Sequence, residues 1–201
     1  MIKAIIFDLG GVILNWDASL MHKYGKFFDI NKAKLSEEMS KEMEKLQRGE
    51  ITTLEFWHKV CSDLDMECPP DDILRNIFPR EYSRAIQVDG QMVELIKKLG
   101  QNYKLGVISN TIEDHEDVFK GFGILEFFDT VILSNEVDLV KPQPEIYELA
   151  LGRLGVEAEE CIFIDDMLSN VHGAKKVGME AILFEGCNNL KENLDKKGIK
   201  F

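Results

Sequence analysis

The sequence predicts an α/β fold, a doubly wound parallel sheet with an all-helical segment inserted after the first strand. Five short apolar runs, at residues 3–9, 104–109, 130–134, 161–165 and 181–184, have the character of strands. They are near-continuous rather than alternating, which is typical of parallel strands buried on both faces. Amphipathic helical segments separate the later runs. Strand alternating with helix is the pattern of a doubly wound sheet.

The helical segments between these strands carry their own start and stop signals. Asp89 has the position of an N-cap, an apolar stripe with helical spacing runs from Met92 to Leu99, and Gly100 follows as a stop. Residues 144–154 have similar character, and the last dozen residues have the composition of a polar helix. These segments are expected to cover the sheet.

Residues 16–86 break the rhythm of strand and helix. An apolar face runs from Leu35 to Leu46, and Thr52 and Glu55 have the spacing of a capping box at the start of a further helix. This stretch shows no strand pattern. It predicts a small helical domain, with the α/β core formed by residues 1–15 and 87–201.

Composition and charge exclude several classes of protein. The chain has 201 residues, 45% of them hydrophobic, enough for one good core and a smaller second one. A formal net charge of −12 offers no basic surface for nucleic acid or anionic lipid. The four cysteines, at 61, 68, 161 and 187, form no C-x-x-C pair, so reduced thiols are expected rather than a zinc site.

The N-terminal apolar run does not have the pattern of a signal peptide. Lys3 precedes the run, but Asp8 interrupts it and no small-residue cleavage site follows. No apolar stretch approaches the roughly 20 residues that a membrane helix needs. We therefore expect a soluble cytoplasmic protein.

Polar residues follow three of the predicted strands. Asp8 ends the first strand, Ser109 and Asn110 the second, and Asp165 and Asp166 the fourth. In an open α/β sheet, ligands bind beyond the carboxyl ends of the strands, where the strand order reverses. These side chains are therefore expected to build one site.

The chemistry of these residues suits a metal ion and a phosphate. Two carboxylates held close repel each other unless a cation or a proton lies between them. Oxygen ligands from Asp8, Asp166 and a backbone carbonyl suit Mg²⁺. Lys141, stiffened by prolines at 142 and 144, can neutralise phosphate charge, and Asn170 can hold the metal-binding loop. Each feature alone has an ordinary explanation as a helix cap, a turn or a rigid loop.

Together, the ordered segments FDLGGV, VISNT, KPQPEIY and FIDDMLSN resemble the four motifs of the haloacid dehalogenase superfamily of phosphotransferases. The resemblance covers the whole chain, because the helical insert is similar to the C1 cap that follows the first motif in that superfamily. It implies a parallel sheet with strand order 5-4-1-2-3. It also implies a phosphatase that forms an aspartyl-phosphate, which water then hydrolyses.

The resemblance also implies roles for single residues. Asp8 would be the nucleophile, and Mg²⁺ would be held by Asp8, the Gly10 carbonyl and Asp166, with Asp165 in support. Lys141 would assist catalysis and bind phosphate, and Ser109 and Asn110 at the end of the second strand would bind phosphate. The substrate would be a small phosphorylated metabolite.

Gly10 departs from the superfamily pattern. Most of its phosphatases carry a second Asp two residues after the nucleophile as general acid and base, and such help is worth about 10²–10⁴ in rate. Without it, leaving groups of low pKa are favoured, such as those of sugar 1-phosphates, acyl phosphates or aryl phosphates. The pattern D-L-G-x-V with S-N-T and His115 is similar to bacterial α-D-glucose-1-phosphate phosphatases.

Alternatives remain open from the sequence. His115 either reaches the site, where it would bind substrate or donate a proton, or is a solvated helix histidine. Asp17 lies near the first motif and is explained as the N-cap of the first inserted helix. The chain itself is a phosphatase, a non-catalytic phosphate-binding or regulatory protein, or a 2-haloacid dehalogenase. The Asp165–Asp166 pair argues against the dehalogenase, and the substrate and oligomeric state are left open.

Overall fold

A parallel five-stranded sheet forms the centre of the computed structural model, which describes residues 1–17 and 19–201. Its strands are β1 (Ala4–Phe7), β4 (Lys104–Ser109), β5 (Thr130–Leu133), β6 (Cys161–Asp165) and β7 (Glu180–Leu183). Their order is β5-β4-β1-β6-β7, and every neighbouring pair is parallel. Numbered along the chain, this is the order 5-4-1-2-3. The predicted fold class is confirmed.

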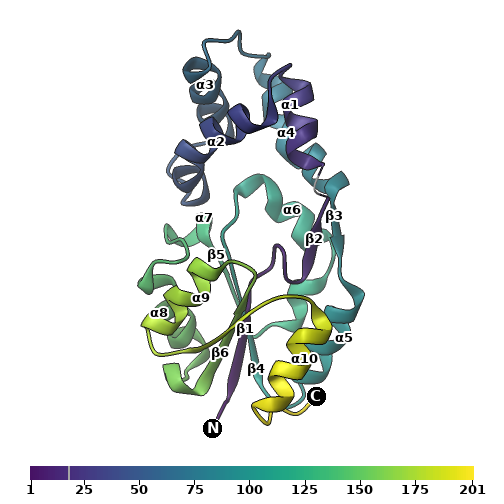
Figure 1. The fold of residues 1–201 in the computed structure, drawn as a ribbon. Coiled ribbons are helices and arrows are strands. Elements are labelled where there is room, and N and C mark those ends of the chain that lie inside the picture. Colours follow the sequence, from purple (N-terminus) through teal and green to yellow (C-terminus); the bar gives the residue numbers. More distant parts are fainter. Residues whose placement is uncertain (18) are drawn as a thin grey trace.

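Helices cover both faces of this sheet, as Figure 1 shows. One face carries α8 (Pro144–Leu154) and α9 (Leu168–Lys176), and the other carries α5 (Gly90–Leu99) and α10 (Cys187–Lys196). The predicted N-cap of α5 is confirmed, because the Asp89 carboxylate accepts a hydrogen bond from Gln91 N at 2.8 Å. Because helices cover both faces, the side chains on both sides of each strand are buried, which explains why the strands are near-continuously apolar.

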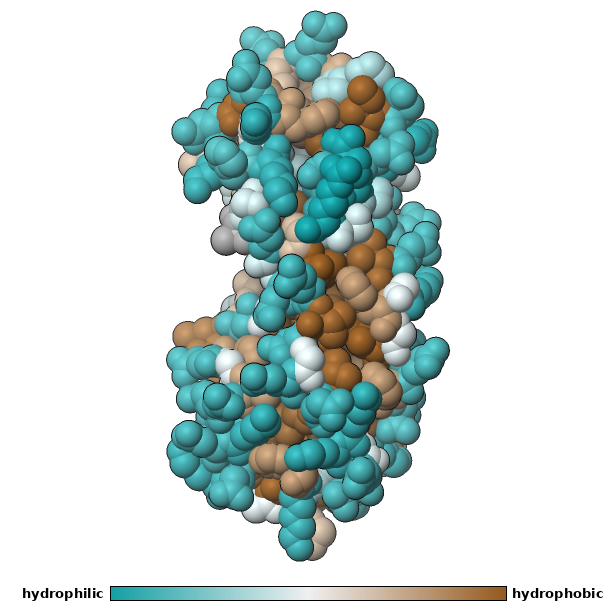
Figure 2. Space-filling model, turned by 90° about the vertical axis from the view of Figure 1, so that its right-hand side faces the viewer, coloured by the Kyte–Doolittle hydropathy of each residue, from teal (hydrophilic) through white to brown (hydrophobic). Residues whose placement is uncertain are grey.

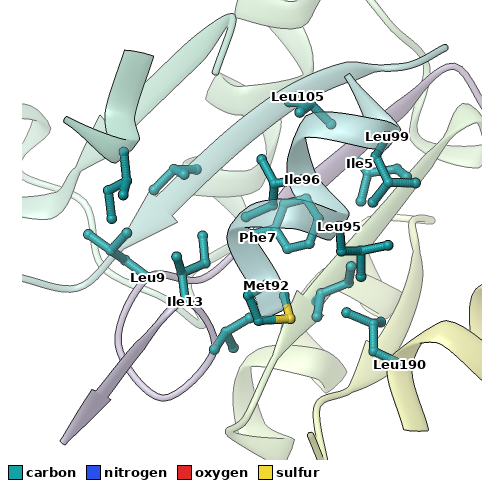
Figure 3. Packing of buried hydrophobic residues seen from close by; sticks show 14 of the residues in the cluster. Ile5, Phe7, Leu9, Ile13, Met92, Leu95, Ile96, Leu99, Leu105 and Leu190 are labelled. Atoms are coloured by element: carbon teal, nitrogen blue, oxygen red, sulfur yellow. The ribbon is translucent and has the colours of Figure 1, made fainter. Parts of the chain in front are cut away.

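The apolar side chains of α5 fill the core between this helix and the sheet (Figure 3). Met92, Leu95, Ile96 and Leu99 are all buried and pack toward the side chains of β1 and the turn that follows it. On the opposite face, a second cluster joins strand residues such as Ile6 to α8 and α9. The two clusters hold β1 rigidly between them, and β1 is the strand that ends at Asp8.

A helical part lies at one end of the sheet (Figure 1). It consists of α1 (Leu20–Phe27), α2 (Lys32–Gln47), α3 (Thr53–Asp63) and α4 (Asp71–Ala85). The capping box between Thr52 and Glu55 is present at the start of α3. A separate aromatic core that includes the buried Phe56, Trp57 and Phe78 holds the four helices together.

Two short strands, which the sequence pattern does not indicate, join the helical part to the sheet. β2 (Leu14–Trp16) pairs antiparallel with β3 (Ile86–Val88), so the chain leaves and returns side by side. Three residues each are too few to show a period. The remaining short elements are α6 (Glu113–Gly121), η1 (Ile124–Phe127), α7 (Ser134–Val137) and η2 (Ala158–Glu160).

The helical part contacts the sheet domain through polar groups at the end of α2. Ser134 Oγ donates to Gln47 O at 2.6 Å, and Arg48 Nη1 donates to Asp138 O at 2.9 Å. Figure 2, which faces the opposite side of the molecule, shows hydrophobic side chains gathered just below the narrow middle, on the sheet domain, with hydrophilic residues over most of both ends. Within residues 1–17 and 19–201, no helix combines the length and the apolar character needed to cross a membrane. All four cysteines are free thiols, as predicted.

Candidate active site

The polar residues predicted to meet at the carboxyl edge of the sheet do meet there. Asp8 directly follows β1, while Ser109 and Asp165 are the last residues of the strands on either side of it. Asp8 N donates to Ile164 O at 2.8 Å, which extends the strand pairing to the carboxylate itself. The site lies at the point where the strand order reverses.

A charged wall, which we define as Asp8, Lys141, Asp165 and Asp166, forms one side of this site. Lys141 Nζ lies 2.6 Å from Asp8 Oδ1 and 2.7 Å from Asp165 Oδ2. Lys141 and Asp165 are buried, Asp8 is 7% exposed, and Asp166 is exposed. The lysine therefore joins the ends of two neighbouring strands.

Two amide side chains hold the charged wall in place. Asn170 Nδ2 donates to both oxygens of Asp165, at 3.0 and 3.1 Å, so it fixes that carboxylate as expected of a loop-holding residue. Asn110 bonds the backbone of Lys141 in both directions: its Nδ2 donates to Lys141 O at 2.9 Å, and its Oδ1 accepts from Lys141 N at 2.8 Å. The Lys141–Pro142 peptide is cis.

The charges of this wall do not balance within the protein. Burial raises the pKa of Asp8 to about 7, with Lys141 opposing the rise and Asp165 adding to it. The pKa of Asp166 is also raised, by burial and then by Asp165. For Lys141, burial lowers the pKa, but the two carboxylates outweigh it and the net direction is upward. Three carboxylates facing one ammonium leave two negative charges when all are ionised.

These carboxylates fit a divalent cation. Asp8, Asp165 and Asp166 each offer an oxygen, and these oxygens lie within 4.8 Å of one another. The Asp165 oxygens already accept hydrogen bonds from Lys141, Asn170 and Met167 N. Carboxylate oxygens are the ligands that hard cations such as Mg²⁺ prefer, and one such ion neutralises the two excess charges.

The two glycines after Asp8 are required for different reasons. Gly11 has a φ of +81°, and a β-carbon there would lie 2.6 Å from Cγ of Asp166, so both backbone and space demand glycine. Gly10 has no such φ, but a β-carbon would lie 2.6 Å from Cζ2 of Trp16. At Gly10 a side chain would be crowded by the indole and not by the backbone.

An aromatic wall, which we define as Trp16, Tyr82, His115 and Phe119, forms the other side of the site. The Trp16 and Tyr82 ring centroids lie 5.0 Å apart in a T-shaped arrangement. Tyr82 stacks on His115 at 3.5 Å with an interplanar angle of 8°, and it meets Phe119 at 5.8 Å. Three different elements, β2, α4 and α6, supply these rings.

His115 is not a solvated helix histidine. Its ring is packed against Tyr82, its Nε2 is buried without a hydrogen-bond partner among the described residues, and burial lowers its pKa to about 3. It reaches the site, as the first alternative expected. At neutral pH it is uncharged, so it is not a protonated acid there.

Both walls line a single cavity of about 380 Å³, within the size range of small-molecule sites. Ser109, Asn110 and Gly10 also line it, and Gln47 reaches it from the end of α2. All the predicted site residues except the buried Asp165 are therefore brought to this cavity.

Comparison with known proteins assigns the family. The model of the haloacid dehalogenase-like hydrolases matches residues 5–184, which includes both walls and the helical part. The chain belongs to this family. The hydrolase is 28% identical over 179 residues to the sesquiterpene phosphatase astK of Aspergillus oryzae, covering 88% of this chain and 87% of that protein.

Two further relatives extend the comparison along nearly the whole hydrolase. It is 26% identical over 206 residues to the D-ribitol-5-phosphate phosphatase of Bacteroides thetaiotaomicron, covering 96% of this chain and 97% of that protein. A solved family enzyme from the same organism, an aspartate-to-alanine variant in complex with magnesium and inorganic phosphate, has the same fold. The TM-score is 0.75 at 24% identity, covering 91% of this chain and 94% of that one.

The sequence reasoning misplaced one residue of the hydrolase and missed several others. Asp17 is not the N-cap of α1: that position is Ser19, and the Asp17 carboxylate accepts from Ser19 N at 2.8 Å and from Lys23 Nζ at 3.1 Å. The missed lining residues include Trp16, Tyr82 and Gln47. None of these residues follows a strand of the main sheet, so the pattern of polar residues at strand ends does not indicate them.

Proposed function

We propose that this hydrolase is a Mg²⁺-dependent phosphatase that releases phosphate from a small metabolite with a leaving group of low pKa. The observation that carries the proposal is the position of Asp8. Its carboxylate faces the cavity, is held by Lys141 at 2.6 Å, and lies beside Gly10, which supplies no acid. A nucleophile and a charge-neutralising lysine are therefore in place, but the usual proton donor is missing.

The carboxylates divide into ligands and support. Asp165 is saturated by Lys141, Asn170 and Met167 N, which suits a positioning role. Asp8 and Asp166 face the cavity, so these two and the Gly10 carbonyl would hold Mg²⁺. The bound ion would neutralise phosphate charge. The magnesium and phosphate of the solved relative support this assignment.

The protein's own residues would then carry the reaction. Asp8 attacks phosphorus, the bond from phosphorus to the leaving oxygen breaks, and water hydrolyses the resulting aspartyl-phosphate. Lys141 and Ser109 bind phosphate oxygens. Asn110 has one amide hydrogen committed to the Lys141 backbone, so its contribution includes holding that lysine in position. Residues 16–86 form the cap that screens substrates.

The finer substrate assignment rests on the leaving group. A sugar 1-phosphate, as in the α-D-glucose-1-phosphate phosphatases that the motifs resemble, leaves with less need of protonation than a simple alkyl ester. His115 lies in the wall nearest the missing acid, and it binds substrate as a neutral ring. The relatives named above are a sesquiterpene phosphatase and a D-ribitol-5-phosphate phosphatase, so their names do not indicate which substrate this hydrolase prefers.

A series of phosphate esters with graded leaving groups tests the proposal. With Mg²⁺, the rate should rise steeply as the pKa of the leaving group falls, and EDTA should abolish it. Absence of turnover for every ester would favour the non-catalytic, phosphate-binding alternative. A parallel assay with 2-chloropropionate distinguishes the dehalogenase, which would release chloride without added metal.

A further inference from the structure

The space above Gly10 is filled by Trp16. A β-carbon built on Gly10 would lie 2.6 Å from Cζ2 and 3.1 Å from Nε1 of the indole. Non-bonded carbon atoms rest at about 3.5–4.0 Å. The place from which a second acid would project is therefore occupied by an aromatic ring, and the sequence change at Gly10 and the position of Trp16 form one structural feature.

Trp16 is also accessible from solvent. It is 45% exposed and lines the same cavity as Asp8, whereas Tyr82 and Phe119 behind it are buried. Of the described residues that line this side, none is ionised at neutral pH. His115 is uncharged because burial lowers its pKa to about 3, and burial raises the pKa of Tyr82.

Resting on the proposed function, we propose that the aromatic wall is the leaving-group subsite and that Trp16 makes it selective for phosphate attached to a ring. The ring is an aryl group or a pyranose, and both share a rigid face that can lie against an indole. A rigid ring loses little conformational freedom on binding.

An open-chain polyol has no rigid face to lie against the indole, and it loses more conformational freedom on binding than a ring does. Hydroxyl groups of either substrate need hydrogen-bond partners once they lose water. Two polar atoms of this wall, Tyr82 Oη and His115 Nε2, have no partner among the described residues. Aryl and anomeric oxygens are, moreover, the leaving groups that need an acid least. The ring selectivity and the loss of the acid at Gly10 thus favour the same substrates.

Phosphonates test the subsite without turnover, because their carbon–phosphorus bond is not hydrolysed. The affinities of phenylphosphonate and methylphosphonate are measured by calorimetry on the Mg²⁺-loaded full chain. We expect phenylphosphonate to bind about tenfold more tightly, a difference typical of one good aromatic contact. A C-pyranosyl methylphosphonate gives the second arm, and preference for either ring supports the proposal.

Variants assign the preference to Trp16. We expect Trp16→Ala to reduce the phenyl-to-methyl ratio to near one, and Trp16→Phe to retain part of it. Phe127→Ala is the matched control, since Phe127 is 38% exposed and lies outside the cavity lining, and it should leave the ratio unchanged. Tryptophan fluorescence of the wild type needs no variant: phenylphosphonate should quench the accessible Trp16, while Trp57 is buried in the helical part.

The outcomes separate the two proposals. If methylphosphonate binds and neither ring compound binds more tightly, the ring subsite is wrong while the phosphate site stands. If no phosphonate binds with Mg²⁺ present, both proposals fail. A ring preference that persists in Trp16→Ala would also overturn the role of Trp16.

Discussion

The two walls of the cavity are built in opposite ways. In the charged wall, Lys141 and Asp165 are tied by hydrogen bonds of 2.6–3.1 Å to one another, to Asp8 and to Asn170. In the aromatic wall, contact is by ring packing, and two buried polar atoms, Tyr82 Oη and His115 Nε2, have no partner within the described structure. One wall fixes charges in space, and the other presents a neutral surface.

This difference separates chemistry from selectivity. A network of charged groups held by hydrogen bonds is preorganised for a reaction that develops charge on a phosphate. A wall of rings has little to offer the phosphate but provides area and shape for the group attached to it. The phosphoryl end of the substrate should therefore be handled by residues of the sheet, and the leaving group by rings from β2, α4 and α6.

The largest expected effect lies in the charged wall. Asp8→Asn keeps the shape of the side chain but removes the nucleophile, so we expect kcat to fall by roughly 10³-fold or more. The free energy of unfolding at pH 7 should not fall, because Lys141 keeps Asp165 as a partner and one buried negative charge is removed. Steady-state assays and urea unfolding measure the two quantities. Substantial turnover in this variant would contradict the covalent mechanism.

The next effect concerns the metal. Mg²⁺ at 100 times its Kd should stabilise the wild type by about 2.7 kcal/mol, seen as a rise in Tm. Asp166→Ala should lose most of this rise without unfolding, because Asp166 is exposed. Asp195→Ala removes an exposed carboxylate on α10 as the matched control and should keep the full rise. An undiminished Mg²⁺ response in Asp166→Ala would exclude it as a ligand.

The contrast between the walls also explains what could be predicted from the sequence. Asp8, Ser109 and Asp165 follow or end strands that are themselves readable as apolar runs, and parallel strands bring their carboxyl ends together by geometry. The fold class, Asp8, Asp165 and Asp166 follow from that local pattern. Lys141 does not end a strand: the sequence predicts that it neutralises phosphate charge, and the structure places it between Asp8 and Asp165.

The aromatic wall has no such local signal. Trp16 lies in a strand of three residues, Tyr82 in the last turn of α4, and His115 in the first turn of α6. Only tertiary packing brings them together, so a periodic pattern in one element cannot reveal the contact. The sequence therefore favours a solvated helix position for His115 over one in the site, and it does not show why position 10 is glycine.

A double-mutant cycle between Gly10 and Trp16 tests the link between the walls. Gly10→Asp alone overpacks against the indole and should lower the free energy of unfolding by about 1–3 kcal/mol. In the Trp16→Ala background the same change should cost about 1 kcal/mol less, since the space is open. The carboxylate then has room to act as a proton donor. The dependence of rate on leaving-group pKa should therefore become shallower in the double variant than in Trp16→Ala.

Additive unfolding free energies in that cycle would mean that Trp16 does not determine the glycine at position 10. A steep leaving-group dependence in a well-folded double variant would show that space alone is not enough to restore an acid. The first result would contradict the structural link between Gly10 and Trp16, and the second would contradict the expectation that an open space restores the acid.

The last expected effect, which is absent at neutral pH, is the acid sensitivity of the aromatic wall. The pKa of His115 is about 3 in the folded protein, against about 6.5 for an ordinary histidine. Between these values the unfolded chain binds a proton that the native chain does not. Stability is therefore undiminished by this group above pH 6.5 and falls as pH decreases toward 3, by up to about 1.4 kcal/mol per pH unit.

His115→Phe should remove this contribution while keeping a ring against Tyr82. At pH 7 its free energy of unfolding should match the wild type, because the stacked contact remains and the lost nitrogen has no partner among the described residues. Between pH 6.5 and 4, urea unfolding should show the wild type losing more stability than the variant. His22→Phe, at an exposed histidine of α1, is the control and should follow the wild type. Parallel pH profiles for the wild type and His115→Phe would mean that the ring takes up a proton in the native state, so this side of the cavity would carry positive charge in acid.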